Sequence, residues 1–440
     1  MRRLLGLRDF VHDAIEKTTD LVQETHDAAA RKPVAVMELI EPLGAVARAV
    51  DTPRSAIAKL VFDRIRATNR TVQAISDVGY KLAQAVLPEE LPIEHTPLGK
   101  AVGEWTDRAE SVLNAVAGDF LEARENGLSI KMSLRLAGRD VTPLELAAQL
   151  GAPRGASASE QNNDARSKVC VFVHGLGCSD SIWREHDELT GTERSFGDEL
   201  ARELGYTSLY VRYNTGLHIS QNGRALALLL EALFAAYPVE LRELALVGHS
   251  MGGLVARSAA HYGRALDHRW SRALSHVLCI GSPHFGAPLE RAGNVLASVL
   301  GFFDVAGTQV PAKLINARSA GIKDLRFGSI LDEDWADADP DAFFTDTSKH
   351  APFVDGVSYG YIAARVKPAS GAVGELLGDL LVQLPSASGE HRDQTRRLPF
   401  HMGHILDGVH HVALTNHPAV YPQIVRFLSA CAPAAARDLP

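Results

Sequence analysis

Cysteine is scarce in this sequence, which contains four among its 440 residues. No two of them have the C-x-x-C spacing of a redox or metal site, and two lie within apolar segments typical of buried strands. They are Cys170, Cys178, Cys279 and Cys431. We therefore expect reduced thiols that pack as small core residues, as in a reducing compartment. A disulfide stays open, because sequence spacing does not show which strands are neighbours.

Long uninterrupted apolar segments are also missing. Near the N-terminus, charged residues recur from Arg8 onward, so a standard secretory signal is not expected. The most apolar early segment, residues 34–50, contains Pro42 and three charged residues, which excludes a membrane-spanning helix. The sequence therefore predicts a cytoplasmic location, with peripheral contact to a membrane or lipid surface left open.

An excess of positive charge is missing as well, because 45 Lys and Arg face 53 Asp and Glu, for a formal net charge of −8. This balance argues against general nucleic-acid binding. The sequence shows no metal-ligand cluster, and Gly175-Leu176-Gly177 lacks the third glycine of a dinucleotide-binding loop. We therefore expect neither a metal nor another cofactor. Hydrophobic residues are plentiful at 46%, which predicts a globular protein with a sizeable core.

The first 126 residues carry no recognisable chemistry and have a helical pattern. Between residues 54 and 86, apolar residues recur at three- and four-residue steps, the spacing of one helix face. Residues 48–81 contain seven Lys or Arg and three Asp. Two interpretations stay open: a helical subdomain packed on the main domain, or an amphipathic surface that contacts a membrane, lipid or polyester. We assign residues 1–126 to a helical N-terminal extension and residues 127–440 to the main domain.

From residue 168 onward, apolar segments of strand length alternate with helical patterns. The expected strands are residues 169–173, 208–213, 244–247, 275–281, 359–366 and 404–409. Helices are expected at 195–204, at 223–237 and directly after Ser250, with a strand or hairpin at 128–141 and a surface loop at 151–167. This alternation predicts the α/β class, with a mostly parallel central sheet and helices on both faces.

Between the 244–247 strand and the next helix, the sequence reads Gly248-His249-Ser250-Met251-Gly252. This G-x-S-x-G pattern is typical of a nucleophile elbow, in which a serine occupies a sharp strand-to-helix turn. The strained turn requires neighbours without bulky side chains, which the two glycines provide. A glycine-rich turn with an exposed serine is the alternative interpretation, but the position between strand and helix favours a catalytic Ser250.

A second glycine-rich segment, His174-Gly175-Leu176-Gly177, follows the 169–173 strand. Glycines there allow backbone N–H groups to approach a substrate oxygen closely. In an acyl-transfer site this segment supplies one donor of the oxyanion hole, the Leu176 N–H, and the Met251 N–H supplies the other. A plain strand-to-helix turn is the alternative interpretation.

A serine nucleophile needs a base, and in chains with this elbow the acid and then the histidine follow the serine. His410 and His411 both follow the last expected strand, and either could be the base. For the acid we favour Asp379, which follows the fifth expected strand, over Glu375 and Asp393. A carboxylate that caps a helix or turn is the alternative role for Asp379.

With Ser250, Asp379 and His411 in this order, the chain resembles the α/β-hydrolase superfamily. Within it, the chain looks like the lipase and esterase branch that includes bacterial triacylglycerol lipases and GPI inositol-deacylases. The segments that carry the resemblance are VFVHGLG at 171–177, LVGHSMGGLVAR at 246–257, CIGSPHFGAP at 279–288 and GVHHVALTNHPAVY at 408–421. The resemblance implies an α/β-hydrolase fold. It also favours His411 over His410, because in such proteins the histidine is followed by an apolar residue and, three positions on, by leucine.

Such lipases often carry a cap or lid where this chain has an insertion, at about residues 289–356. Apolar residues cluster at roughly helical spacing between residues 295 and 303. A mobile apolar cover over an acyl pocket would explain them, and a helix packed in the core is the alternative.

The serine and the resemblance together imply a serine carboxylester hydrolase, an esterase or lipase with a role in lipid metabolism. It would act on lipophilic acyl esters through a Ser-His-Asp triad and an acyl-enzyme. The alternative enzyme is an intracellular polyester depolymerase or a phospholipase that docks through its N-terminal helices. A non-catalytic scaffold on a hydrolase fold is the alternative class. The expected partner is an acyl ester substrate, and no nucleic acid is expected.

Overall fold

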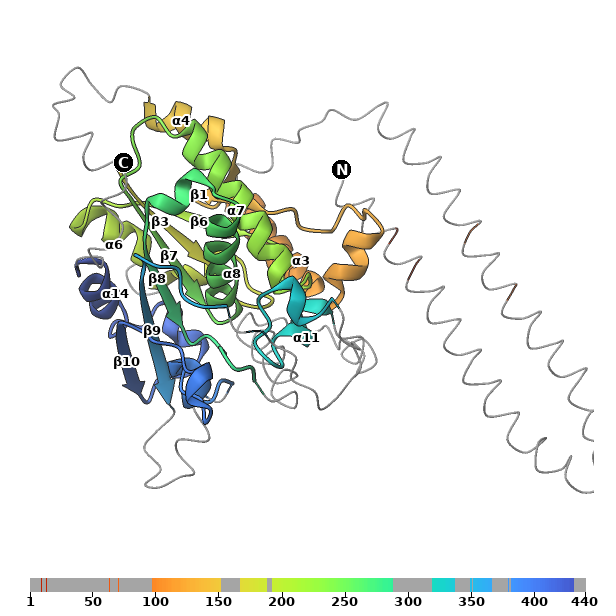
Figure 1. Cartoon of the computed structure of the whole chain (residues 1–440). Coiled ribbons are helices and arrows are strands. Elements are labelled where there is room, and N and C mark those ends of the chain that lie inside the picture. The colour runs from red at the N-terminus through yellow and green to blue at the C-terminus, as the bar shows by residue number, and fades with distance from the viewer. Residues whose placement is uncertain are drawn as a thin grey trace, which may run out of the picture. The chain divides into compact units, whose positions relative to one another are not determined.

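A computed structural model describes most of the chain from residue 97 onward (Figure 1). The described residues are 97–151, 167–187, 192–287, 319–336, 349, 351–365, 379 and 381–430, with the single residues 9, 13, 63 and 70. The chain divides into two compact units, one of residues 1–101 and 121–128 and one of residues 102–120 and 129–440. In the first unit, Arg124 and Asp13 form an ion pair of 2.9 Å. The second unit contains all the predicted site residues.

The second unit is built on an eight-stranded sheet in the order β2-β1-β6-β3-β7-β8-β9-β10. The strands are β1 (Ser133–Leu136), β2 (Arg139–Val141), β3 (Lys168–Val173), β6 (Thr207–Arg212), β7 (Glu243–His249), β8 (Leu274–Ile280), β9 (Ser358–Arg365) and β10 (Met402–Asp407). Neighbours from β6 to β10 pair in parallel, whereas β1 is antiparallel to both β2 and β6. The carboxyl ends of the parallel strands therefore meet at one edge of the sheet.

Helices cover both faces of this sheet. On one face α7 (Ile219–Ala236) and α8 (Met251–Ala265) lie side by side, and on the other lie α6 (Phe196–Glu203) and α14 (Tyr421–Leu428) (Figure 1). The rings of Phe196 and Tyr421, 5.8 Å apart, join α6 to α14. The shorter elements are α4 (Pro143–Gly151), η2 (Asp180–Trp183), β4 (Arg184–Asp187), β5 (Thr192–Ser195), η3 (Arg269–Arg272), α11 (Ala320–Asp324), η4 (Asp332–Asp334), α13 (Leu384–Ser388), η5 (Gln394–Arg396) and η6 (Val412–Thr415).

The core is centred on β3, which lies between β6 and β7. Every side chain from Val169 to Val173 is fully buried. The Phe172 ring stacks on that of Tyr210 at 5.2 Å and lies 5.0 Å from that of Trp183. A parallel strand covered on both faces must be apolar at every position, which explains the unbroken apolar sequence.

The α/β class with a mostly parallel sheet, predicted from the alternation of strands and helices, is confirmed. Each expected strand is present within two residues of its predicted start and end. The segment 128–141 contains the antiparallel hairpin of β1 and β2. The separate hairpin of β4 and β5 was not predicted, because its sequence lacks apolar alternation.

Part of the segment assigned to the N-terminal extension packs within the second unit. The helix α3 (Pro97–Ala123) spans both units, and its residues 102–120 belong to the second. There Val112, Ala115 and Val116 join the main core, and buried Glu110 pairs with Arg212 of β6 at 2.6 Å. The pairing joins residues 102 positions apart, which helical periodicity alone does not indicate.

Several predicted features lie outside the described residues: most of residues 1–96, the loop 152–166, residues 288–318 and 337–348 of the expected lid, Glu375 and Cys431. The other three cysteines are free and buried, as expected. Within the described part of the chain, no helix combines the length and apolar character needed to cross a membrane.

Candidate active site

Ser250 occupies the turn between β7 and α8, at the carboxyl edge of the sheet. Its backbone has φ 54° and ψ −122°, a conformation that residues with a Cβ rarely adopt. Such strain costs about 1–3 kcal/mol and persists only where the surroundings hold it. Here the Ser250 N–H donates to the Ile280 carbonyl at 2.8 Å, and the Gly253 N–H donates to the Ser250 carbonyl at 3.1 Å.

The two glycines of the pattern are required by close backbone contacts. A Cβ at Gly248 would lie 2.4 Å from the backbone of Gly252 and Gly253. A Cβ at Gly252 would lie 2.2 Å from the Val173 carbonyl oxygen, so α8 begins directly against the end of β3. The glycines therefore bring the elbow and the 174–177 segment together.

The structure brings two further predicted residues into direct contact. His411 Nδ1 and Asp379 Oδ2 are 2.6 Å apart, and both side chains are buried. The other carboxylate oxygen, Oδ1, accepts from the N–H groups of Leu381 at 3.1 Å and Val382 at 2.8 Å. Because an ionised carboxylate only accepts hydrogen bonds, Nδ1 carries the proton and Nε2 keeps its lone pair. This is the tautomer that a general base requires.

His410 and Asp393, the alternative candidates for the base and the acid, lie away from the Asp379–His411 pair. The His410 side chain is exposed, and its Nδ1 accepts from the Ala413 N–H at 3.4 Å. Asp393 is exposed at the start of η5, where its Oδ1 accepts from the Thr395 N–H at 2.9 Å. Neither residue has a described contact with His411.

His249, predicted only as a member of the elbow, also joins the nucleophile turn to His411. Its Nε2–H donates to the His411 carbonyl at 3.0 Å, and the two rings lie 4.8 Å apart. Burial lowers the pKa of His249 well below its ordinary value, and the charge of a protonated His411 lowers this pKa further. His249 therefore stays neutral at the pH values at which a catalytic base gains and loses its proton.

Among the described residues, Ser250 Oγ forms no hydrogen bond with His411. In hydrolases without bound substrate this hydrogen bond is commonly long or absent, and it forms when substrate binds.

The 174–177 segment lies against Ser250, the position that the predicted oxyanion loop requires. A Cβ at Gly175 would lie 3.0 Å from Ser250 Cβ and 3.2 Å from His249 Nδ1. The Leu176 N–H has no acceptor among the described residues. Met251 is the first residue of α8, so its N–H has no acceptor within the helix. Two backbone donors are thus available beside Ser250.

Sequence reasoning missed two residues that contact this loop. Thr215 and Tyr213 follow β6, whose carboxyl end lies beside that of β3. Thr215 accepts a hydrogen bond from the Gly177 N–H, and Tyr213 donates one to the His174 carbonyl. The available signal was their position: polar residues directly after a parallel strand lie at the same sheet edge as the nucleophile.

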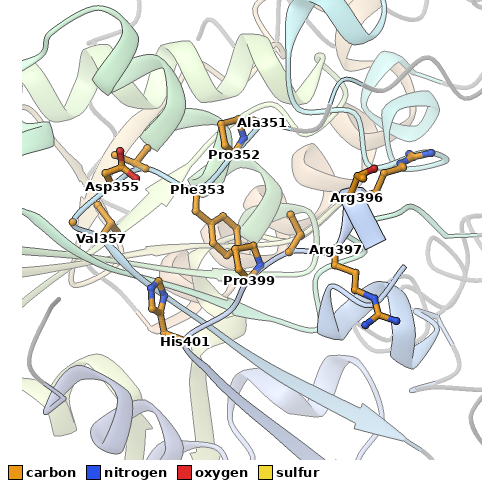
Figure 2. Close-up of a pocket in the computed structure, with 13 residues that line it drawn as sticks. Ala351, Pro352, Phe353, Asp355, Val357, Arg396, Arg397, Pro399 and His401 are labelled. Carbon is orange, nitrogen blue, oxygen red and sulfur yellow. The ribbon is translucent and has the colours of Figure 1, made fainter. Parts of the chain in front are cut away.

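A cavity of about 430 Å³ lies away from these residues, at the start of β9 and β10. Val357 precedes β9 and His401 precedes β10, whereas the predicted site residues follow the strands (Figure 2). Phe353 lines its centre, and the side chains of Arg396 and Arg397 extend away from that ring (Figure 2). This cavity is therefore not the site of the predicted chemistry.

The strand order, the parallel pairing and the strained serine turn after β7 decide the fold. The fold is that of an α/β hydrolase. In agreement, a family model, the PGAP1-like alpha/beta domain, matches residues 167–339. The resemblance to the lipase and esterase branch that the four sequence segments indicated is thereby confirmed. No curated protein sequence gave a significant match.

Solved structures show a distant likeness to this chain. A lipase-esterase related protein from Clostridium acetobutylicum is 13% identical, with a TM-score of 0.33, over 60% of this chain and 95% of that one. Lipase B from Aspergillus fumigatus is 12% identical, with a TM-score of 0.37, over 65% and 58%. Phospholipase PlaB from Legionella pneumophila is 17% identical, with a TM-score of 0.37, over 60% of each chain.

Metal ligands are not gathered in the described part of the chain, where no group of three or more His, Cys, Asp or Glu side chains is arranged to hold an ion. That the protein needs no cofactor stays a prediction.

Proposed function

We propose that this protein is a serine carboxylester hydrolase, an esterase or lipase with Ser250, His411 and Asp379 as its catalytic triad. The observation that carries the proposal is the strained Ser250 turn at the same sheet edge as the buried His411–Asp379 hydrogen bond. A non-catalytic protein gains nothing from a strained serine turn, so this combination favours an enzyme over a scaffold.

In the first half of the reaction, His411 Nε2 takes the Ser250 proton while Ser250 Oγ attacks the ester carbonyl carbon. The carbonyl oxygen becomes an oxyanion, which accepts hydrogen bonds from the Leu176 and Met251 N–H groups. The protonated His411 then gives its proton to the leaving alkoxide. The alcohol departs, and the acyl group stays bonded to Ser250 Oγ.

In the second half, water replaces the alcohol. His411 Nε2 takes a proton from water, the resulting hydroxide attacks the acyl-enzyme, and the same two N–H groups stabilise the second oxyanion. His411 then returns the proton to Ser250, and the carboxylic acid departs. Asp379 holds the imidazole orientation and stabilises the imidazolium throughout.

The proposed preference for lipophilic acyl groups depends on the apolar sequence between residues 295 and 303, which lies outside the described residues, and on the resemblance to lipases. A polyester depolymerase or phospholipase that docks through residues 1–126 remains the alternative enzyme. The described residues contain no observation that favours it.

The deciding experiment is hydrolysis of a nitrophenyl ester series by wild type and Ser250→Ala. We expect hydrolysis by wild type, with longer acyl chains favoured over acetate, and a loss of kcat by Ser250→Ala of at least about a thousandfold. The matched control is Ser275→Ala, which should keep wild-type activity. Ser275 lies at the start of β8, whereas the candidate site lies at the carboxyl ends of the strands. Cleavage of acetate alone would contradict the lipophilic preference.

Labelling with a fluorophosphonate tests the nucleophile itself. An activated serine in a folded hydrolase forms a covalent adduct, so wild type and Ser275→Ala should be labelled at Ser250. Ser250→Ala should stay unlabelled. No adduct on Ser250 in folded wild-type protein would refute the hydrolase proposal.

A further inference from the structure

The oxyanion loop is held by hydrogen bonds from the loop that follows β6. The Gly177 N–H donates to Thr215 Oγ1 at 3.2 Å. Thr215 is 1% exposed, so water does not compete for this hydrogen bond. Thr215 thereby fixes the peptide plane directly after Leu176, whose N–H is the proposed oxyanion donor.

The other end of the oxyanion loop is fixed as well. The Tyr213 hydroxyl donates to the His174 carbonyl at 2.7 Å, and the two rings stack with centroids 4.5 Å apart. Two residues of one loop therefore hold the peptides on either side of Gly175 and Leu176. Between these two anchors, the orientation of the Leu176 N–H is set before substrate arrives.

Thr215 is itself held in place by α11, a helix of the insertion after β8. The Gly321 N–H donates to the Gly216 carbonyl at 3.1 Å, and a Cβ at Gly321 would lie 2.1 Å from the Thr215 carbonyl oxygen. Asp324, at the end of α11, accepts from the Ile219 N–H at 2.8 Å and contacts His218 Nδ1 at 3.0 Å. The loop after β6 therefore lies between the oxyanion loop and α11, with direct hydrogen bonds to both.

We infer that Thr215 is a positioning residue for the oxyanion hole, and that α11 keeps Thr215 in position. The inference depends on the proposed hydrolase function. Thr215 touches neither substrate nor the reacting atoms. It acts by supplying the acceptor that orients the Gly177 and Leu176 peptides, so its loss should affect the transition state more than substrate binding.

The substitution that isolates this role is Thr215→Val, which keeps the shape of the side chain and removes the acceptor. A buried Gly177 N–H without a partner is unfavourable, so the loop should shift until the N–H finds another acceptor. Loss of a complete oxyanion donor typically lowers kcat about 100- to 1,000-fold. A displaced donor should therefore lower kcat roughly 10- to 100-fold, with KM changed less than about twofold.

The experiment compares wild type, Thr215→Val, Thr215→Ser and Thr207→Val in ester hydrolysis and in inhibition by an alkyl trifluoromethyl ketone. This inhibitor adds to the serine and presents an oxyanion, so its Ki should rise in Thr215→Val by the same factor as kcat falls. Thr215→Ser restores the acceptor and should recover both values to within about threefold. Thr207→Val, at the other end of β6, is the matched control and should behave as wild type.

A purely structural role would lower the melting temperature without a selective loss of kcat and inhibitor affinity. If Thr215→Val does not fold, Thr215→Ala replaces it in the same comparison with Thr215→Ser. The inference would be overturned if the variant without the hydroxyl had the same kcat and Ki as wild type. It would also be overturned if Thr215→Ser lost as much kcat and inhibitor affinity as Thr215→Val. If the Thr215 inference fails in this way but Ser250→Ala is inactive, the proposed hydrolase function still holds. Full activity in Ser250→Ala would refute both.

Discussion

Asp379 uses both oxygens of its carboxylate, one on the backbone of its own loop and one on His411. The two backbone N–H groups fix the carboxylate before it contacts the imidazole, so the direction of the Nδ1 hydrogen bond does not depend on a flexible side chain. The tautomer of His411 is thereby determined by a residue 32 positions earlier in the chain.

Replacing Asp379 with Asn should therefore change the tautomer while preserving the fold. The amide oxygen can accept from Leu381 and Val382, which leaves the NH2 group facing His411 Nδ1. Nδ1 must then be the acceptor and Nε2 carries the proton, so His411 cannot take a proton from Ser250. We expect kcat to fall by about four orders of magnitude, measured by ester hydrolysis.

The matched control is Asp393→Asn, in the exposed turn at the start of η5, which should retain wild-type kcat. Full activity in Asp379→Asn together with loss of activity in Asp393→Asn would assign the acid to Asp393.

At the scale of elements, the site depends on how closely α8 starts against β3. A Cβ at Gly252 would overlap the Val173 carbonyl, and a Cβ at Gly175 would lie 3.0 Å from Ser250 Cβ, so neither position has room for a side chain. The carboxyl ends of β3 and β7 and the N-terminus of α8 are thus a single packed unit, and a displacement of one moves the others.

Gly252→Ala should disrupt this unit. Its Cβ would lie 2.2 Å from one carbonyl oxygen and 2.6 Å from the next, and neither can move without shifting β3. Overpacking of this kind costs about 1–3 kcal/mol or more of the free energy of unfolding, and the forced shift should also abolish most activity. Urea denaturation and ester hydrolysis measure the two effects.

Gly151→Ala provides the control. A Cβ there would have one neighbour, Pro238, at 4.0 Å, so the substitution should change the free energy of unfolding by less than about 1 kcal/mol. Similar unfolding curves for the two variants would show that the elbow tolerates a methyl group at Gly252.

The central strands were predictable because a parallel strand covered on both faces is apolar over most of its length, as residues 169–173 of β3 and 277–280 of β8 are. The serine turn was predictable because its close backbone contacts require glycine at positions 248 and 252, and this pair of glycines around the serine is visible in the sequence. The contact between Thr215 and Gly177 was not, because it joins ordinary polar groups 38 positions apart. The packing of α3 was missed for the same reason, since Glu110 and Arg212 are neighbours only in the folded chain.

At the scale of the whole molecule, buried histidines link stability to pH. Burial lowers the pKa of His174 to about 4, and burial also lowers the pKa values of His249 and His284 well below the ordinary value. The folded chain therefore keeps these three side chains neutral, whereas the unfolded chain protonates them near pH 6.5. Their contribution is present above pH 6.5 and is lost as the pH falls from 6.5 toward 4.

We therefore expect the free energy of unfolding to decrease between pH 6.5 and 4, by up to about 1.4 kcal/mol per pH unit for each of the three histidines. Urea denaturation across this range measures the slope. Arg257 Nη1 lies 3.0 Å from His284 Nδ1, and His284→Gln keeps an acceptor for it. This substitution should reduce the pH slope of the free energy of unfolding by the contribution of one histidine. His410→Gln, at an exposed position, should leave the slope unchanged. Parallel curves for wild type and His284→Gln would contradict the assignment.

The link between His249 and the His411 carbonyl joins residues 162 positions apart in the sequence. Synthesis proceeds from the N-terminus, so the Ser250 turn leaves the ribosome well before Asp379 and His411 do. Contacts of such large sequence separation also form slowly, because loop closure must precede them. In the proposed mechanism, a nascent chain that already contains Ser250 but lacks His411 therefore has no base to activate the serine. Ester hydrolysis by the proposed mechanism can begin only after the last strand and the His411 turn have been made and have folded against β7.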